Sequence, residues 1–342
     1  MDKIIFSDIK FIVGKIGSIK KNFKNTKILI VGGTGFIGKW LLLTFDYLNK
    51  IEKSNITIFV LTRSKRNFIK KNPEFQKLKS INYINGDILN FNVKNKKFNY
   101  IIHAGSDLKV NNKDQTRYLK ELSIGSKKIF EIDNKNLNPK ILFISSGAVY
   151  KNNNTKKKIK EKNTFLPSQF SLDDTYSLGK SLAEIYAKLY VKYSNKKIII
   201  VRGFSFVGPY QQFERGFAVT DFIKSSLINK NIHIKNGDNI YRSYLYIADL
   251  IIWLLHILTK GEIGEIYNVG SDKSVSLKQL SKIIIKVSKS KSKVISVNKN
   301  KSKKINYYIP NINLVKNKLN LKIWTDLNHS IDKTTSWFKN QK

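Results

Sequence analysis

The sequence lacks several residues on which common chemistries depend. It has no cysteine, which excludes disulfides, thiolate zinc sites and cysteine nucleophiles, and which is typical of a protein of the reducing cytosol. Its histidines are few, lie far apart and show no ligand spacing; they are His103, His233, His256 and His329. We therefore expect a cytoplasmic protein that holds no metal and uses no thiol.

No hydrophobic run is long enough for a membrane span. The most apolar stretch, residues 244–258, is interrupted by Asp249 and His256 and is shorter than the roughly 20 residues that a span needs. It predicts a buried helix. Residues 1–15 carry an acid at position 2 and no small-residue cleavage site, which predicts a leading helix and no signal peptide. We expect no membrane insertion.

Acidic residues are scarce, 24 against 63 lysines and arginines, and the formal net charge is +39. Such a charge can indicate nucleic-acid binding. Here lysine is spread along the whole chain beside abundant Asn and Ile, as in proteins of AT-rich genomes, so we expect no specific nucleic-acid surface. Only six of the basic residues are arginine. We therefore expect arginine where a planar, forked donor for phosphate or carboxylate is needed.

The sequence does contain a clear alternation of strands and helices. Apolar runs predict six strands, at 27–31, 56–61, 81–85, 98–104, 140–145 and 197–202. Amphipathic patterns between most of them predict helices at 36–51, 115–133 and 176–192. Such alternation is typical of an α/β fold with a doubly wound parallel sheet of the Rossmann type.

Two polar stretches interrupt this pattern. Residues 151–174 lack periodicity and predict a surface loop, and "SKSKSK" at 288–293 predicts a charged surface segment. After residue 202 the pattern becomes mixed. We expect a Rossmann domain of residues 1–202, to which 241–262 return, and a smaller mixed α/β substrate domain made of 203–240 and 263–342.

Three glycines, Gly32, Gly35 and Gly38, follow the first strand in "GGTGFIG". In a strand-to-helix turn the first glycine permits the tight turn, the second lets the backbone approach a pyrophosphate, and the third lets the helix pack on the strand. The helix N-terminus then meets the phosphate charge. Because a strand precedes and a helix follows, the motif predicts a dinucleotide site.

The end of the second strand bears on the choice of dinucleotide. Sites that prefer NAD usually place Asp or Glu there to hold the adenosine ribose. This chain has Thr62 and Arg63, with Arg66 close behind. The guanidinium groups favour the 2′-phosphate of NADP. The alternative is NAD, with Arg63 stacking on adenine.

From about residue 22 to 340 the chain resembles the extended short-chain dehydrogenase/reductases that act on nucleotide sugars, in particular a subgroup named epimerase/dehydratase. The resemblance is carried by "GGTGFIG", "GDI" at 86–88, "IIHAG" at 101–105, "SSGAVY" at 145–150, "YSLGK" at 176–180, "RGFSFVGPY" at 202–210, "RSYLYIADL" at 242–250 and "YNVGS" at 267–271. It implies a homodimer. Besides the glycines, Thr62 and the two arginines, it implies that the cofactor is bound by Phe36, Ile37, Asp87, Ile88, His103, Ala104, Gly105, Tyr176, Lys180 and Phe206, with Asp87 and Ile88 at the adenine and 103–106 beneath the cofactor.

The spacing Tyr-x-x-x-Lys occurs twice, at Tyr176/Lys180 and at Tyr193/Lys197. In so lysine-rich a chain the spacing alone selects neither pair. Tyr176 opens a helical stretch and Ser146 ends the preceding strand, whereas Tyr193 lies at a helix end without a serine partner. We therefore predict that Ser146, Tyr176 and Lys180 are catalytic.

A charge argument assigns their roles. Residues four apart share a helix face, so Lys180 can stand below the Tyr176 ring. A cation roughly 4 Å away at an effective dielectric near 20 contributes about 4 kcal/mol, enough to bring a phenol pKa from about 10 to near 7. Such a phenol can exchange a proton with a sugar hydroxyl while hydride passes to or from nicotinamide. Ser146 would hydrogen-bond the same oxygen, and Lys180 would also hold the nicotinamide ribose.

The residues after Ser146 bear on the reaction. The 4,6-dehydratases that the chain resembles carry an Asp-Glu pair there, whereas this chain has Gly147 and Ala148. Dehydration is therefore disfavoured. We expect reduction of a 4-keto-6-deoxyhexose nucleotide, dTDP-linked, with 4-epimerisation as the alternative. Outside enzymes, an NADP-sensing regulator is the remaining reading.

The resemblance also implies residues that bind the nucleotide-diphosphate sugar. Arg242 matches an arginine that grips the diphosphate, and Arg215 is a second candidate. The alternative for each is a surface ion pair. The other substrate positions are Ser106, Ser146 and Ser205. Ser205 is a departure, because many relatives have Asn there.

Overall fold

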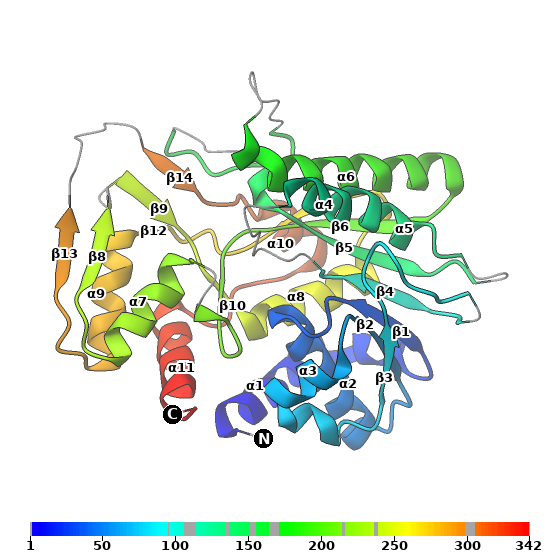
Figure 1. Cartoon of the computed structure of the whole chain (residues 1–342), viewed down its shortest axis with the longest axis horizontal. Coiled ribbons are helices and arrows are strands. Elements are labelled where there is room, and N and C mark those ends of the chain that lie inside the picture. The colour runs from blue at the N-terminus through cyan, green and yellow to red at the C-terminus, as the bar shows by residue number, and fades with distance from the viewer. Residues whose placement is uncertain are drawn as a thin grey trace.

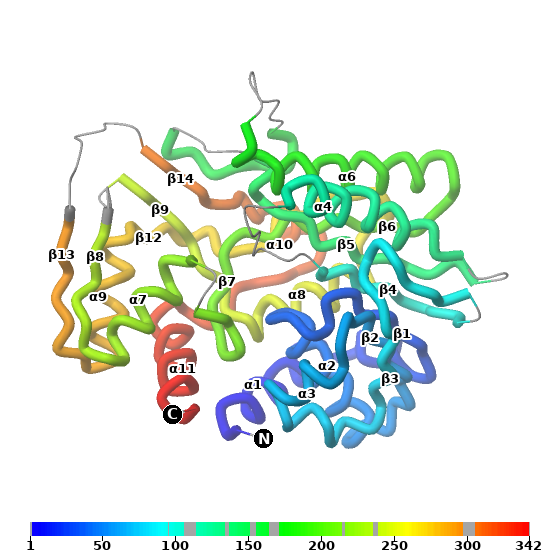
Figure 2. Tube along the Cα trace, viewed as in Figure 1, coloured from blue at the N-terminus to red at the C-terminus, as the bar shows by residue number. Residues whose placement is uncertain are grey.

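The structure is a computed structural model of the chain, shown in Figures 1 and 2. It describes residues 2–94, 96–105, 114–133, 137–150, 155–163, 171–213, 216–235, 239–297 and 305–341. The predicted site residues Ser106 and Arg215 and parts of the predicted loop 151–174 lie outside the described residues.

Seven parallel strands form the central sheet (Figure 1), in the spatial order β11-β6-β5-β4-β1-β2-β3. In chain order they are β1 (Lys27–Val31), β2 (Thr57–Thr62), β3 (Ile81–Asn85), β4 (Tyr100–His103), β5 (Lys140–Ser146), β6 (Lys197–Gly203) and β11 (Ile266–Val269). The six predicted strands and the doubly wound α/β class are confirmed. The seventh strand, β11, was not predicted.

The sheet is buried on both faces, and strand β1 shows how. Ile28 and Ile30 pack into one hydrophobic cluster, while Leu29 and Val31 pack into a second one on the opposite face. Successive side chains of a strand alternate in this way. A continuous apolar run therefore marks a strand that is covered twice.

Helices supply both covers. One cluster includes α1 (Lys3–Ile16), α2 (Phe36–Glu52) and α8 (Ile247–Lys260), and the other includes α5 (Ser126–Phe130) and α6 (Thr175–Ser194). The leading helix and the buried helix in 244–258 are thus confirmed. The predicted helix 115–133 is present as α4 (Gln115–Lys120) and α5, joined by the π-helical turn η3 (Glu121–Gly125). Two short elements follow β2, α3 (Lys65–Lys71) and the 3-10 turn η2 (Pro73–Lys77).

The later segments build three small sheets beside the main one. Strand β8 (Ile232–Lys235) pairs with β13 (Val294–Val297), β9 (Ile240–Arg242) lies between β12 (Val275–Ser276) and β14 (Asn306–Tyr308), and β7 (Phe206–Val207) pairs with β10 (Leu245–Tyr246). Their helices are α7 (Ala218–Leu227), α9 (Leu277–Ser288), α10 (Asn313–Leu319) and α11 (Leu327–Lys339). The remaining 3-10 turns are η1 (Gly17–Phe23), η4 (Gly147–Tyr150) and η5 (Leu172–Asp174).

The chain crosses between the two regions more than once. Helix α8 returns to the main sheet, and β11 joins its edge although it comes from the segment 263–342. In the segment 288–293 the lysines Lys289 and Lys291 are exposed, but Ser288 and Ser292 are buried. Within the described ranges, no helix has the length and apolar character that crossing a membrane requires.

Candidate active site

A cavity of about 1670 Å³ runs along the carboxyl ends of the central strands. In a sheet of this order β1 has β2 on one side and β4 on the other, which is the switch point where ligands bind. The cavity exceeds the size of an ordinary small-molecule pocket, so it has room for two ligands. Of the predicted site residues it is lined by Gly32, Gly35, Phe36, Ile37, Thr62, Arg63, Asp87, Ile88, Ala104, Gly105, Ser146, Tyr176, Ser205, Phe206 and Arg242.

The turn between β1 and α2 has the geometry of a phosphate cradle. Gly32 has φ +83°, and a Cβ there would collide with the backbone of Gly105. A Cβ on Gly38 would collide with the carbonyl oxygen of Gly32, so only glycine lets α2 approach the turn this closely. No side chain caps the start of α2, whose first residues line the cavity. Its amides can therefore bind the diphosphate of a dinucleotide, which fits an NAD(P) site.

The cavity continues over the ends of β2 and β3. Thr62 and Arg63 line it, whereas Arg66 is exposed and is not among the lining residues. The Asp87 carboxylate accepts hydrogen bonds from the amides of Leu89 and Asn90, at 2.9 and 2.8 Å, and its second oxygen pairs with Arg117 at 3.1 Å. These contacts hold the Asp87 side chain in place before a ligand binds.

His103, which was predicted to bind the cofactor, does not line the cavity. Its ring is fully buried, with Nε2 2.9 Å from Ser126 Oγ. Burial, with Lys180 nearby, lowers the His103 pKa well below its usual value and keeps the ring neutral. Of the described residues 103–105 of this segment, Ala104 and Gly105 line the cavity.

The predicted catalytic residues meet where β5 ends and α6 begins. Ser146 is the last residue of β5, and its Oγ accepts a hydrogen bond of 3.1 Å from the amide of Ala148. Tyr176 lies in the first turn of α6, and its ring stacks on Tyr118 with centroids 6.4 Å apart. Both side chains line the cavity. The competing tyrosine, Tyr193, is 71% exposed at the far end of α6.

Lys180 stands one turn behind Tyr176, inside the protein. It is only 1% exposed, and its Nζ donates a 2.9 Å hydrogen bond to the carbonyl oxygen of Ile144. The ammonium also lies 5.0 Å from the centroid of the Phe143 ring. Burial lowers the Lys180 pKa to about 8, against the opposing pull of Glu184. A lysine so tuned can change its charge near neutral pH.

The structure adds Tyr308, which the sequence analysis missed. Its hydroxyl lies close to Ser146 and Tyr176, and burial raises its pKa, so it stays protonated. A Cβ atom added to Gly147 would collide with this hydroxyl. Tyr308 comes from β14, far along the chain, and no local motif distinguishes it.

The predicted substrate residues lie at the other end of the cavity. Arg242 is half-buried, and its Nη1 donates to the Tyr241 carbonyl at 2.8 Å and to Asn306 Oδ1 at 2.9 Å. Burial lowers its pKa, but from so high a starting value that it stays charged. Gln211 also lines the cavity, and its buried Oε1 has no hydrogen-bond partner among the residues that the structure describes. It is a second residue that sequence motifs did not mark.

In the part of the chain that the structure describes, no three His, Asp or Glu side chains gather as metal ligands would. A second, smaller cavity of about 420 Å³, beside β12, α9 and the start of α11, contains none of the predicted site residues.

This fold and cavity define an NAD(P)-dependent enzyme of the extended short-chain dehydrogenase/reductase type. Residues 28–270 match the NAD dependent epimerase/dehydratase family, and the chain belongs to it. It is 30% identical to an uncharacterized protein of Methanocaldococcus jannaschii over 285 residues, which are 79% of this chain and 83% of that protein. It is also 30% identical to a dTDP-D-glucose 4,6-dehydratase of Dictyostelium discoideum over 281 residues, 77% of this chain and 62% of the relative.

Solved structures share the fold. The dTDP-glucose 4,6-dehydratase of Bacillus anthracis in complex with NAD aligns with a TM-score of 0.76 at 20% identity, covering 92% of this chain and 97% of that one. The UDP-glucose 4-epimerase of Thermotoga maritima with UDP-glucose aligns with a TM-score of 0.75 at 19% identity, covering 92% and 99%. RMD of Pseudomonas aeruginosa complexed with NADPH aligns with a TM-score of 0.72 at 16% identity, covering 93% and 100%. Both cofactors thus occur on this fold.

Proposed function

We propose that this chain is an NAD(P)-dependent reductase of nucleotide sugars that reduces the 4-keto group of a 6-deoxyhexose, with a dTDP-linked sugar as the first substrate to test. The observation that supports this choice is the end of β5. A 4,6-dehydration needs its own acid and base beside Ser146, and here Gly147 and Ala148 follow it. The Tyr308 hydroxyl fills the space beside Gly147. A carboxylic side chain has no room at that position.

The residues at the end of β5 and the start of α6 would move the proton. Tyr176 donates it to the sugar oxygen at C4, and Ser146 hydrogen-bonds the same oxygen. Lys180 stabilises the phenolate that remains, because its charge lies one helical turn away. NAD(P)H, when bound, supplies the hydride. Tyr308 stays protonated and orients Ser146.

NADP is the proposed cofactor. The α2 N-terminus and the glycine turn would hold the diphosphate, and Arg63 would pair with the 2′-phosphate, because no carboxylate occurs from Thr62 to Lys71. A run of further polar residues at this end, Ser64, Asn67 and Lys71, also lines the cavity. At the other end, Arg242 would bind the diphosphate of the sugar nucleotide.

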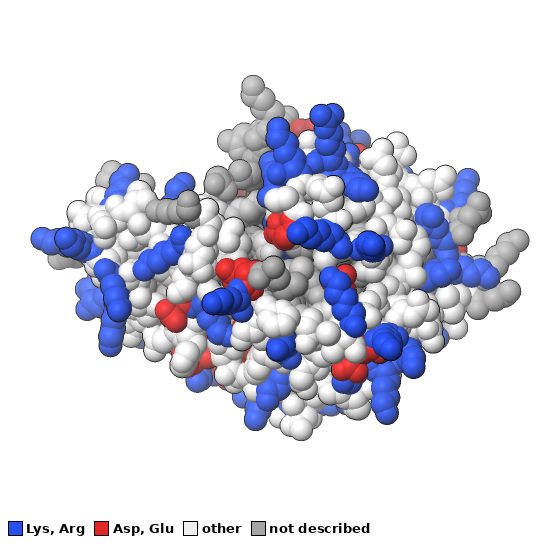
Figure 3. All heavy atoms as spheres, turned by 90° about the horizontal axis from the view of Figure 1, so that it is seen from below, with Lys and Arg blue, Asp and Glu red and all other residues white. Residues whose placement is uncertain are grey.

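The proposed partner is a second copy of the chain and not a nucleic acid. Helix α6 presents Leu182, Ile185 and Leu189 at 42%, 54% and 45% exposure, spaced so that they share one face. Such a stripe can meet its own copy across a two-fold axis. By contrast, the basic side chains on the face in Figure 3 are scattered over it with acidic ones between them. This scatter supports a solvated surface.

The test supplies NADPH and a dTDP-4-keto-6-deoxyhexose and follows absorbance at the wavelength of the reduced cofactor. Loss of NADPH in step with reduced sugar supports the proposal. Formation of an epimerised sugar without loss of cofactor would instead identify a 4-epimerase. Tyr176→Phe should abolish turnover, whereas Tyr193→Phe, on the exposed end of the same helix, should leave it unchanged.

A further inference from the structure

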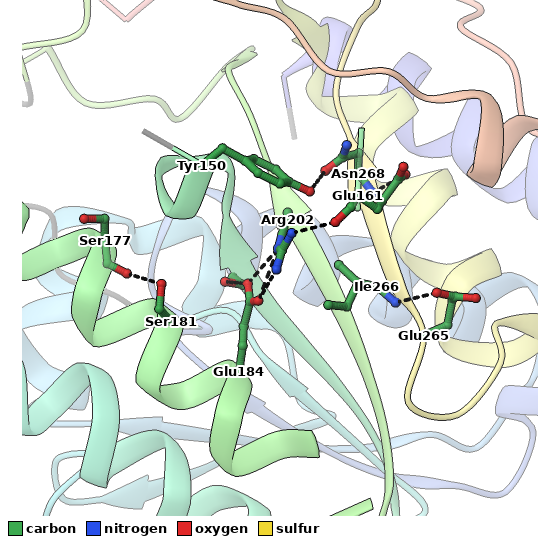
Figure 4. Close-up of polar contacts among 10 residues, drawn as sticks. Tyr150, Glu161, Ser177, Ser181, Glu184, Arg202, Glu265, Ile266 and Asn268 are labelled. Atoms are coloured by element: carbon green, nitrogen blue, oxygen red, sulfur yellow. Dashed lines mark hydrogen bonds and ion pairs between the residues drawn. The ribbon is translucent and has the colours of Figure 1, made fainter. Parts of the chain in front are cut away.

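Figure 4 shows a buried charged cluster between α6 and β6, with Glu184 and Arg202 facing each other. Its centre is Glu184 on α6, which is 5% exposed. The Glu184 carboxylate accepts hydrogen bonds from Arg202 Nη2 at 2.6 Å and from Arg202 Nε at 3.0 and 3.1 Å. It also accepts one from Ser145 Oγ at 2.5 Å. One carboxylate thereby links α6, β6 and the end of β5.

This cluster is joined to the catalytic residues in two ways. Ser145 directly precedes Ser146, so the bond from Ser145 to Glu184 fixes the strand end that carries the serine. Glu184 follows Lys180 by one helical turn, and Lys180 follows Tyr176 by one turn, so the three lie along one side of α6. The carboxylate favours the charged form of Lys180 against the effect of burial.

Arg202 is the charged partner of this carboxylate. Its Nη1 donates to the carbonyl oxygen of Glu161 at 3.2 Å, and its guanidinium lies 4.5 Å from the centroid of the Tyr150 ring. The hydroxyl of Tyr150 in turn donates to Asn268 Oδ1 at 2.8 Å (Figure 4). The pair of Glu184 and Arg202 is neutral as a whole. Removing either partner leaves one buried charge uncompensated.

We propose that Glu184 and Arg202 are positioning residues of the proposed reaction, which hold the β5 end in place and set the charge state of the Tyr176–Lys180 pair. This inference rests on the proposed function. An ordinary structural ion pair would hold the elements together without influencing the proton on the phenol or on the ammonium.

The other charged or titratable groups around Lys180 do not supply this effect. His103 on β4 is neutral, and Tyr308 on β14 is protonated. His103 on β4 and Glu184 on α6 interact electrostatically with Lys180, and Arg202 on β6 is paired with Glu184. Among these groups the formal charges belong to Glu184 and Arg202.

The test compares the pH dependence of kcat/KM among Glu184→Gln, Arg202→Met and the double variant. Reduction needs a protonated phenol, so activity falls as pH rises through the pKa of the Tyr176–Lys180 pair. Glu184→Gln leaves the positive charge of Arg202 without its partner, which favours loss of a proton from the Tyr176–Lys180 pair. The alkaline limb of the pH profile of kcat/KM should therefore move to lower pH by about one unit. Arg202→Met leaves a net negative charge and should move it to higher pH. The neutral double variant should return it close to the wild-type position.

The matched control is Glu262→Gln, which removes the same charge from an exposed pair with Lys318 and should leave the limb in place. Single variants that lower activity without moving the limb, or that move it in the same direction, would overturn the inference. Because these variants can fold poorly, Ser145→Ala provides a milder change that removes one bond to Glu184. It should lower kcat at least threefold with the limb unmoved.

A second readout separates this inference from the proposed function. The affinity for NADPH, measured by quenching of protein fluorescence between pH 6 and 10, should weaken above the pKa of Lys180, with the same opposite displacements in the single variants. A protein that binds NADPH with these displacements but reduces no 4-keto sugar would contradict the proposed function alone. Binding whose pH dependence is identical in all four proteins would contradict the inference.

Discussion

Lys180 is buried where its positive charge is unfavourable. We therefore predict that Lys180→Met stabilises the protein while abolishing its activity. Burial brings the Lys180 pKa from its usual 10.5 to about 8. At about 1.4 kcal/mol per pKa unit, the buried ammonium costs about 3 kcal/mol of folding free energy at neutral pH. Methionine has a similar volume and carries no charge. It loses the hydrogen bond to Ile144, worth about 1–2 kcal/mol, so the net gain should be about 1–2 kcal/mol.

The sign of the pH dependence gives a sharper check. A lysine with a depressed pKa is charged in both states below pH 8, so its cost is fully present there. Between about pH 8 and 10.5 the folded protein has released the proton and the unfolded chain has not, so stability rises with pH in this window. The variant lacks this rise.

The measurement is the free energy of unfolding in urea at pH 7 and at pH 10, for the wild type and for Lys180→Met. The difference between the two proteins should shrink or change sign at the higher pH, while the many surface lysines contribute equally to both. Activity should be lost at both pH values. A variant that is less stable at pH 7, with a difference that does not change with pH, would refute the account of the buried ammonium.

Three further predictions concern cofactor, assembly and packing. Arg63→Ala should weaken the binding of NADPH about tenfold and leave the binding of NADH nearly unchanged, as measured by fluorescence titration with both cofactors. An equal loss of affinity for both would contradict a contact with the 2′-phosphate. Leu189→Asp, which places a charge in the apolar stripe of α6, should convert a dimer to a monomer in light scattering, and an unchanged mass would exclude this interface. Gly38→Ala should destabilise the protein by about 1–3 kcal/mol in thermal unfolding, because its Cβ collides with the Gly32 carbonyl oxygen, whereas Gly14→Ala, in open space on α1, should stabilise it.

The main sheet could be predicted from the sequence because both of its faces are buried. Five of the first six strands contain a continuous apolar run, whereas β3, at the edge of the sheet, alternates apolar residues with Asn82 and Asn85. The strand β11 was missed because its short apolar run is interrupted by Asn268, whose buried side chain is hydrogen-bonded through both its nitrogen and its oxygen. The two-residue strands β7, β10 and β12 have no pattern of their own. Tertiary contacts alone define them.

The site was predictable where it depends on the topology of the sheet. Ser146 ends β5 and the glycine turn follows β1, and the carboxyl ends of these parallel strands share one edge of the sheet, so both lie at the same cavity. The position of Tyr308 does not follow from the topology of the main sheet. It reaches Ser146 from β14, which pairs with β9, and nothing near residue 308 in the sequence indicates that contact. The expectation for His103 did not foresee that its side chain, at the end of β4, is buried against Phe143, while Ala104 and Gly105 line the cavity.

The positions at which this chain has arginine and lysine agree with the proposed chemistry of the site. Where this chain keeps arginine within the described residues, the guanidinium often makes forked or buried contacts, as in Arg202 with Glu184 and Arg242 with Asn306. At the position behind the phenol it keeps lysine, although that position is more buried than either. An arginine there would stay charged at any accessible pH, and its planar fork could not be satisfied by one carbonyl oxygen. A lysine can release its proton, so the choice of Lys180 makes sense for proton transfer and not for stability, which it lowers.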